Sequence, residues 1–175
     1  MLNISKSKKI AIIALMSTFS IILASIANFK IPFFTFFKPD FSDMPIFVLT
    51  FMFGGKYGVI SLFIVSTVRM LTGDTVLPAT FMLRVSSSIV IFFINYYKKY
   101  QKNFCLLAVI AIICNIIIRV PISYYLWVFN YNITREVFVN QMWPSIILLT
   151  VIRLSCNIII SKLIFKYFGE KLVIR

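Results

Sequence analysis

Four arginines lie inside stretches of sequence that are otherwise apolar enough to enter a lipid bilayer. They are Arg69, Arg84, Arg119 and Arg153. An isolated guanidinium at the centre of a bilayer costs at least about 2.5 to 3.5 kcal/mol on insertion scales, so such a residue faces a polar cavity or a protein partner. Its planar fork of N–H donors suits a carboxylate or the polar edge of a ring. The arginines therefore predict a membrane protein that handles a polar ligand.

The four arginines do not carry the same prediction. Arg69 is close to the outer end of a predicted helix, where its side chain can snorkel to the interface without any function. Arg84 lies about one and a half turns into its apolar run, and an ion pair with an outer-loop acid explains it as well as a ligand does. Those acids are Asp40, Asp43 and Asp74. Arg119 and Arg153 lie deeper, which favours a ligand or a partner.

The residues needed for catalysis or for metal binding are missing. The chain has no histidine, which removes the most frequent general base and metal ligand. No carboxylates pair at helical spacing inside an apolar run, and no G-x-S-x-G motif is present. Asp40 and Asp43 are three apart but precede Pro45, where helix capping explains them. We therefore predict that the chain is not an enzyme and uses no cofactor.

Composition places the chain in the membrane. Of its 175 residues, 61% are hydrophobic and 13% are charged, and the mean hydropathy is +0.97, beyond what a soluble domain of this size sustains. The net charge of +13 does not indicate nucleic acid binding, because the basic residues flank apolar runs instead of forming one stripe. We predict an all-α integral membrane protein whose single domain covers residues 1–175.

Six apolar runs predict a bundle of six transmembrane helices. Their ranges are 10–29, 44–53, 57–71, 78–97, 104–129 and 143–167. The second helix rises only about 15 Å, half the hydrocarbon thickness, so neighbours must bury it or its flanks must extend it. Gly54-Gly55 predicts a tight turn, Pro121 a break in the fifth run, and residues 130–141 a polar connection before the sixth.

The charge asymmetry predicts the orientation of the bundle. If the amino terminus is cytoplasmic, the inner ends of the helices collect most of the basic residues. These are Lys6, Lys8, Lys9, Lys56, Lys98, Lys99, Lys102, Lys162, Lys166, Lys171 and Arg175, against Lys30, Lys38 and Arg135 outside. All the acidic residues except Glu170 fall outside. Both termini are therefore predicted to be cytoplasmic.

The first loop and the second predicted helix, together with the turn that follows it, resemble a known family. Their residues are Ile31-Pro32-Phe33-Phe34, then Phe37-Lys38-Pro39-Asp40-Phe41-Ser42-Asp43-Met44-Pro45, and then Phe53-Gly54-Gly55-Lys56-Tyr57-Gly58. This pattern is similar to the signature of energy-coupling factor (ECF) vitamin transporter S components, the riboflavin-specific subgroup above all. The resemblance covers essentially the whole chain in length, number of spans and orientation.

The resemblance implies a small six-helix protein of the bacterial cell membrane that binds one vitamin near its outer face. It also implies partners, namely a shared transmembrane subunit and two cytoplasmic ATPases. The chain itself has no glycine-rich phosphate loop and cannot hydrolyse ATP, so such partners would supply the energy. We expect the substrate-capture subunit of an ECF importer, with riboflavin as the first candidate ligand.

The resemblance also indicates site residues. In riboflavin-type members the fifth helix carries an Asn six residues before a Pro, which Asn115 and Pro121 reproduce. The sixth carries Asn-x-x-Lys, where this chain has Thr150 and Arg153. Arg119 adds a guanidinium on nearly the same helix face as Asn115 and has no acidic partner in any predicted span. The expected ligand-binding set is Asn115, Thr150, Arg153, Arg119, Arg84 and Asp40.

Some residues of that set differ from the riboflavin-type pattern, and they leave other ligands as alternatives. Riboflavin is uncharged near neutral pH, whereas Arg119 and Arg153 together suit an anionic precursor or another vitamin. A different class of protein also fits, because a membrane scaffold subunit would pair its arginines with carboxylates of its partners. These alternatives differ in what the protein would bind.

Two further features each have an ordinary explanation. The family uses small residues of the first helix to pack against the shared membrane subunit, and Ala11, Ala14 and Thr18 supply them here, but small residues occur in any membrane bundle. Aromatic residues near the outer ends of the fifth and sixth helices fit an interfacial belt or a wall for a planar ring. They are Tyr124, Tyr125, Trp127 and Trp143.

Overall fold

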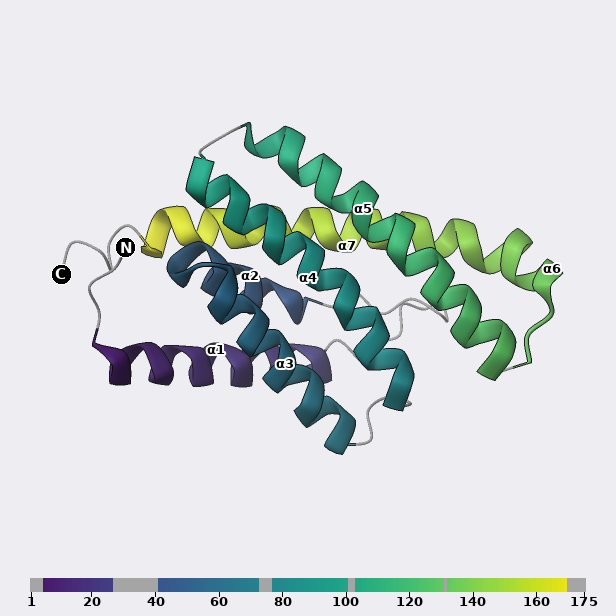
Figure 1. The fold of residues 1–175 in the computed structure, drawn as a ribbon, viewed down its shortest axis with the longest axis horizontal. Helices are drawn as coiled ribbons and strands as arrows, with labels where there is room; N and C mark the ends of the chain where they lie inside the picture. The colour runs from purple at the N-terminus through teal and green to yellow at the C-terminus, as the bar shows by residue number, and fades with distance from the viewer. Residues whose placement is uncertain (1–4, 27–40, 73–76, 101–102, 131, 170–175) are drawn as a thin grey trace.

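Helices make up nearly all of the structure (Figure 1). The computed structural model describes residues 5–26, 41–72, 77–100, 103–130 and 132–169, and these ranges contain no strand. The α-helices are α1 (Lys6–Ile26), α2 (Asp43–Phe53), α3 (Gly55–Leu71), α4 (Leu77–Tyr100), α5 (Phe104–Tyr125), α6 (Arg135–Val137) and α7 (Trp143–Ile164). The π-helical turns η1 (Leu126–Asn130), η2 (Phe138–Met142) and η3 (Phe165–Gly169) continue α5, α6 and α7. The described residues thus form six helical rods, one for each predicted apolar run.

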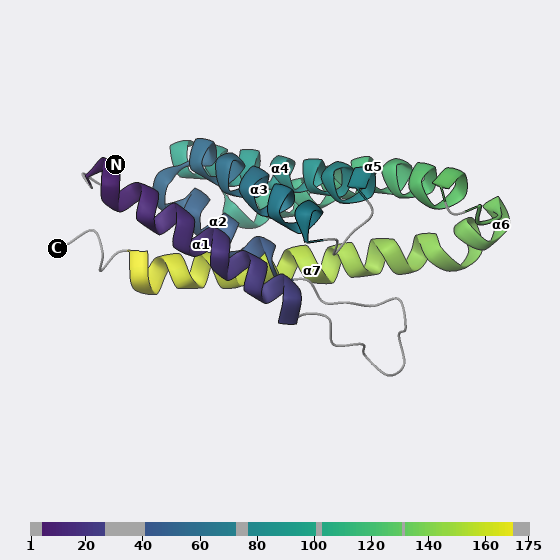
Figure 2. The ribbon, with the colours of Figure 1, turned by 90° about the horizontal axis from the view of Figure 1, so that it is seen from below.

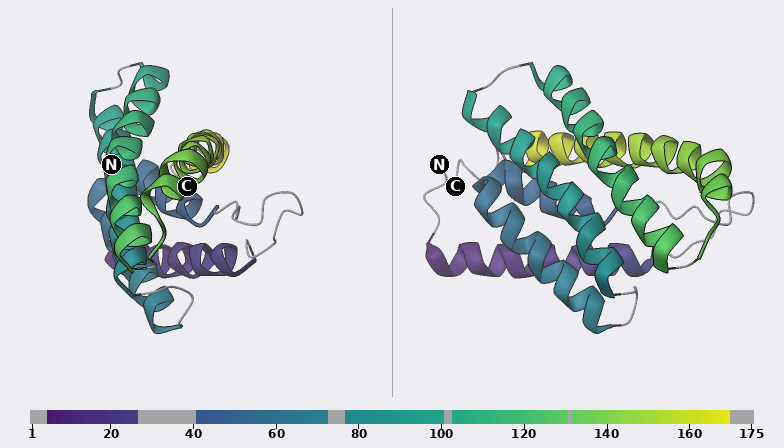
Figure 3. Two further views of the ribbon diagram at one scale, coloured as in Figure 1. Left: turned by 90° about the vertical axis from the view of Figure 1, so that its right-hand side faces the viewer. Right: turned by 45° about the vertical axis from the view of Figure 1, so that its right-hand side comes forward.

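The rods pack in two layers. Figures 2 and 3 show α3, α4 and α5 side by side in one layer, while α1, α2 and α7 lie against its face with α2 between the other two. The buried core joins apolar side chains from both layers. Its residues are Ile46, Phe47, Phe51, Leu62, Val65, Val90, Ile91, Ile94, Ala111, Leu154 and Ile158.

The short helix α2 is enclosed by its neighbours. Residues 45–52 are all buried, and the helix contacts α1, α3, α4 and α7. A helix that is apolar all round is stable only when it is surrounded on all sides. Of the two ways in which the sequence allowed this short run to be accommodated, the structure therefore shows burial.

Three of the rods are long and apolar enough to cross a membrane, and they cover Lys6–Ile26, Phe104–Phe129 and Arg135–Tyr167. Their outer faces carry large apolar side chains, among them Leu15, Ile117 and Ile152. So many exposed large apolar side chains are not typical of soluble monomers and match helices that face lipid. The structure thus has the all-helical architecture of a multi-pass membrane protein.

The predicted break at Pro121 is wrong. Helix α5 continues through this proline to Tyr125, and the π-helical turn η1 follows directly. A proline removes one backbone N–H and normally breaks a helix in water. In membrane helices, neighbouring helices and local π-type adjustments satisfy the freed backbone groups.

The last rod begins earlier than the sequence indicated. Residues 130–141 were expected to form a polar connection, but α6 starts at Arg135 and runs through η2 into α7. Phe138 accounts for the extension, because it is buried and its ring contacts Tyr124 edge-on at 5.2 Å between centroids. Pro144 lies at the start of α7, where its missing N–H interrupts little.

The predicted turn between the second and third helices is present at Gly54. This glycine has a φ of 100°, a left-handed value that costs glycine little and other residues more. The N–H of Gly55 donates to Asn95 Oδ1 of α4 at 2.9 Å. The turn is therefore fixed from outside as well as by its own backbone.

Candidate functional site

A buried carboxylate lies at the start of α2, between two guanidiniums. Asp43 is 1% exposed. Its Oδ1 accepts a hydrogen bond from Arg84 Nη1 of α4 at 2.7 Å, and its Oδ2 lies 3.5 Å from Arg153 Nη2 of α7. The ion pair between Arg84 and an acid, one of the two readings that the sequence left open for that arginine, is thus present.

Two serines complete this group of side chains. Ser87 of α4 donates to Asp43 Oδ2 at 3.1 Å, and Arg84 Nη2 donates to Ser42 Oγ at 2.9 Å. The backbone carbonyl of Ser42 in turn accepts a hydrogen bond from Ser20 Oγ of α1. We refer to Ser42, Asp43, Arg84, Ser87 and Arg153 as the Asp43 cluster. The cluster joins α2, α4 and α7, and Ser42 ties it to α1.

Hydrogen bonds and the dipole of α2 stabilise the buried charge of Asp43. A buried charge pair is stable only when hydrogen bonds offset its desolvation, and both carboxylate oxygens of Asp43 have such partners. The carboxylate also lies in the first turn of α2, where the helix dipole favours a negative charge. These five side chains contain two guanidiniums and one carboxylate.

Asn115 lies next to the Asp43 cluster on α5. It is fully buried, and its Nδ2 donates to the backbone carbonyl of Ser86 at 2.6 Å. Ser86 immediately precedes Ser87 in α4, so Asn115 contacts the same turn of helix that binds Asp43. Asn115 Oδ1 is buried and has no hydrogen-bond partner within the described ranges. Since buried polar atoms are nearly always hydrogen-bonded, this oxygen marks a place for a donor.

Two other predicted site residues each lie one helical turn from a residue already described. Thr150 is buried on α7, one turn before Arg153, and its Oγ1 donates to Ile146 O at 2.7 Å. Its hydroxyl oxygen is left as an acceptor. Arg119 lies one turn after Asn115 on α5 and is partly buried. Asp40, the last member of the expected set, lies outside the described residues.

The sequence did not identify Asp43, Ser42 and Ser87 as functional residues. It explained Asp43 by helix capping and also named it as one of three acids that Arg84 could reach. The structure starts α2 at Asp43 itself and directs its carboxylate to Arg84. Ser42 precedes the helix and makes no side-chain capping bond. A usable signal was present, since an aspartate beside a short apolar helix needs a cation once that helix is buried.

The small residues of α1 are divided between its two faces. Ala11, Ala14 and Thr18, the expected partner-binding residues, are exposed, and Thr18 Oγ1 donates within its own helix to Ala14 O. Ser17 is buried instead and shares a hydrogen bond of 2.7 Å with Ser61 of α3. The exposed small residues therefore lie on a face that this chain does not use for its own packing.

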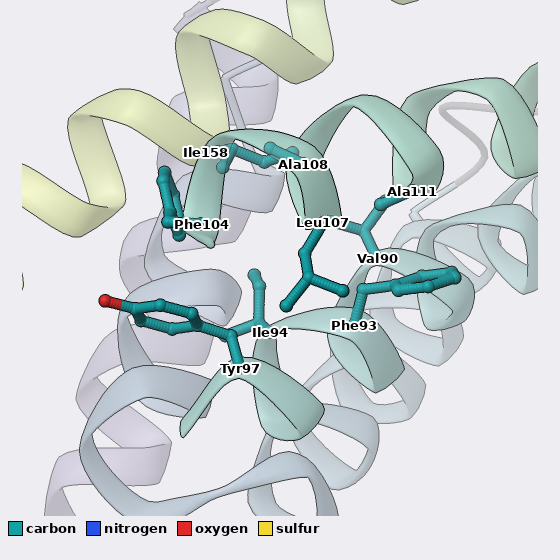
Figure 4. A pocket seen from close by; sticks show the side chains of 9 residues that line it. All are labelled: Val90, Phe93, Ile94, Tyr97, Phe104, Leu107, Ala108, Ala111 and Ile158. Atoms are coloured by element: carbon teal, nitrogen blue, oxygen red, sulfur yellow. The ribbon is translucent and has the colours of Figure 1, made fainter. Parts of the chain in front are cut away.

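An apolar cavity lies between α4, α5 and α7 (Figure 4). Its lining includes Val90, Ile94, Leu107 and Ala111, together with the rings of Phe93, Tyr97 and Phe104. The space holds little more than a water-sized sphere. Without polar lining, it is unsuited to a water-soluble ligand. The described residues also contain no group of three or more potential metal ligands.

Comparison with known protein families gives a match over most of the chain. A family model described as ECF transporter, substrate-specific component, matches residues 8–167. No curated protein and no solved structure matches the chain. The matched range covers all but the outermost residues of the six helical rods. It contains every member of the Asp43 cluster, together with Asn115, Thr150 and Arg119.

Proposed function

This chain belongs to the ECF transporter substrate-specific component family, and on that premise we propose that it captures a water-soluble vitamin for uptake. The observation that carries the proposal is the polar group formed by the Asp43 cluster and Asn115. It joins four helices in the interior of the bundle. Buried ionisable residues in a membrane protein are expensive and mark a ligand pathway by default.

Riboflavin is our first candidate for that vitamin. The residues around Asp40 and the spacing of Asn115 and Pro121 resemble the riboflavin-specific subgroup. The flavin ring edge presents carbonyl acceptors on either side of an N–H donor. Arginine side chains supply only donors and Asn115 Oδ1 is an acceptor, so the two sets are complementary.

A second candidate is a vitamin or precursor that carries a carboxylate. The guanidiniums of Arg84 and Arg153 favour it, because a guanidinium can form bidentate hydrogen bonds with a carboxylate. Thr150 and Arg153 stand where riboflavin-type members have Asn and Lys, which also favours a different ligand.

Family membership also supports a proposal about energising partners. We propose that the chain assembles with a shared transmembrane subunit and two cytoplasmic ATPases in the bacterial cell membrane, with both of its own termini in the cytoplasm. The exposed residues Ala11, Ala14 and Thr18 of α1 support a close helix–helix contact with the membrane subunit.

The ligand can be identified by native mass spectrometry of the detergent-solubilised protein. We expect a retained molecule with the mass of a vitamin, and quenching of flavin fluorescence if that molecule is riboflavin. The matched variant Asn115→Ala should lose the molecule, whereas Asn132→Ala, an exposed asparagine, should retain it. Binding of a carboxylate vitamin without flavin binding would reject riboflavin and keep the class.

Copurification separates the importer from the scaffold alternative. Recovery of one membrane subunit with two ATPases is the result expected for an importer. A reproducible set of membrane partners without any ATPase, from a preparation that also retains no small molecule, would contradict the proposal.

A further inference from the structure

We propose that an anionic phospholipid binds where α4, α5 and α7 meet, with its phosphate on Lys162 and an acyl chain along the apolar cavity of Figure 4. This inference does not depend on the vitamin that the protein binds, because it concerns other side chains and a ligand supplied by the membrane. It needs only a chain that is embedded in a bilayer.

The ammonium of Lys162 on α7 is held over two aromatic rings. Its Nζ lies 3.5 Å from the centroid of the Phe104 ring of α5 and 5.4 Å from that of Tyr97 of α4. The two rings contact each other edge-on at 5.1 Å between centroids. Both distances from the ammonium are in the range of cation–π attraction. A ring face engages one side of an ammonium that has three N–H donors, so the rings orient Lys162 and leave donors for an oxygen anion.

Two further lysines lie at the ends of the same helices. Lys166 is exposed about one turn beyond Lys162 on the same rod, and Lys99 is exposed in the last turn of α4. The end of α4, the start of α5 and the end of α7 lie at one end of the bundle (Figure 1). Within the described ranges the acids are Asp43, which is bound in its own cluster, and Glu136 of α6. No acid among them neutralises these lysines, so they suit a phosphate.

The apolar cavity beside Lys162 suits part of an acyl chain. Ile158, one turn before Lys162 on α7, lines it together with Tyr97 and Phe104 (Figure 4). Both rings and Ala108 are only partly buried, so the cavity is not sealed from the surface of the bundle. Its enclosed volume is too small for a whole molecule. A chain that lies along α4 and α5 can nevertheless place methylene groups against its apolar lining.

A phospholipid with a net negative charge is the ligand that uses both features. Basic pockets between transmembrane helices are typical sites for anionic headgroups. A soluble anion would gain nothing from the apolar cavity, and a zwitterionic lipid would bring no net charge to the lysines. The rule that places basic residues on the cytoplasmic side explains why lysines occur at helix ends. It does not explain why one of them is fixed over two rings beside an apolar cavity.

The test measures lipid binding by the full-length protein in detergent. Dioleoyl phosphatidylglycerol is added at increasing concentration, and dioleoyl phosphatidylcholine and inorganic phosphate are the comparison ligands. Native mass spectrometry counts the lipids that are retained, and thermal unfolding measures stabilisation. The variants are Lys162→Gln, Lys162→Arg and Ala108→Leu. Lys56→Gln is the matched control, because Lys56 is an exposed lysine in the first turn of α3.

We expect the parent protein to retain phosphatidylglycerol in preference to phosphatidylcholine and to unfold a few degrees higher with it, because a ligand stabilises the state that binds it. Lys162→Gln should weaken this binding by about fivefold or more, the effect of one lysine near an anionic headgroup. Lys162→Arg keeps the charge and the stacking and should bind as the parent does. Ala108→Leu should weaken binding because the larger side chain fills part of the cavity. Lys56→Gln should bind like the parent.

Three outcomes would overturn the proposal. The first is equal retention of the two lipids by the parent protein. The second is an equal loss in Lys162→Gln and Lys56→Gln, which would show that only the overall charge matters. The third is equal stabilisation by inorganic phosphate, which would assign the lysines to a soluble anion. If Lys162→Gln does not fold, Lys166→Gln takes its place against the same control. None of these results bears on vitamin binding, so failure here leaves the proposed function standing.

Discussion

At the scale of single residues, the central feature is that several side chains share the carboxylate of Asp43. Asp43 is almost fully buried and has contacts with Arg84, Ser87 and Arg153. A buried ion pair contributes little net stability by itself, yet removing one partner leaves the other charge uncompensated. Asp43 and Arg84 should therefore behave as a unit in mutagenesis.

Replacing Arg84 tests that unit. We expect Arg84→Leu to lower the free energy of unfolding by about 3 to 5 kcal/mol, because the Asp43 carboxylate then loses its closest cation. The double variant Arg84→Leu/Asp43→Asn should recover part of this loss, since a neutral amide is cheaper to bury than a lone carboxylate. Chemical or thermal unfolding in detergent measures both. A double variant less stable than Arg84→Leu would contradict the prediction.

At the scale of elements, the position of Asp43 depends on close packing between α2 and α3. The two helices are joined at Gly54, and Gly58 of α3 lies against Thr50 of α2. A Cβ atom added to Gly58 would lie only 2.1 Å from Thr50 Oγ1, and that hydroxyl is bonded to Ile46 O at 2.9 Å. The absence of a side chain at Gly58 therefore sets how near α2 approaches its neighbour.

The variant Gly58→Ala tests this contact. We expect it to destabilise the protein by about 1 to 3 kcal/mol, as overpacking in a filled core does, and to weaken vitamin binding because α2 carries Asp43. Adding Thr50→Ala removes the clashing hydroxyl and should restore much of the loss. The unfolding midpoints of Gly58→Ala and of Gly58→Ala/Thr50→Ala measure the loss and its recovery. If Gly58→Ala is as stable as the parent, the helices are not held this closely.

At the scale of the whole molecule, the orientation of the bundle across the membrane can be tested. In Figure 1 the beginning of α1 and the end of α7 lie at the same end of the bundle. The basic residues that flank the rods predict that this end faces the cytoplasm. The exposed Asn103, before α5, and Asn132, before α6, then lie on opposite sides of the membrane.

Cysteine labelling in intact cells checks that orientation. In a variant whose Cys105, Cys114 and Cys156 are replaced by alanine, we expect Asn132→Cys to react with a membrane-impermeant maleimide added outside. Asn103→Cys should react only after the membrane is permeabilised. The reverse pattern would show an inverted protein, and equal labelling of both positions would show that the bundle does not span the membrane.

The sequence alone determined the membrane class, the helical architecture and the family, because these depend on composition, on the lengths of apolar runs and on the first-loop motif. It placed Arg84 near an acid but could not choose that acid, and it treated Asp43 as a cap. Which groups meet depends on the approach of α2, α4, α5 and α7, which are far apart in the chain. Only the tertiary structure could bring Asp43 to Arg84 and Arg153, and Asn115 to Ser86, because burial of α2 forces its charged end to find partners inside the bundle.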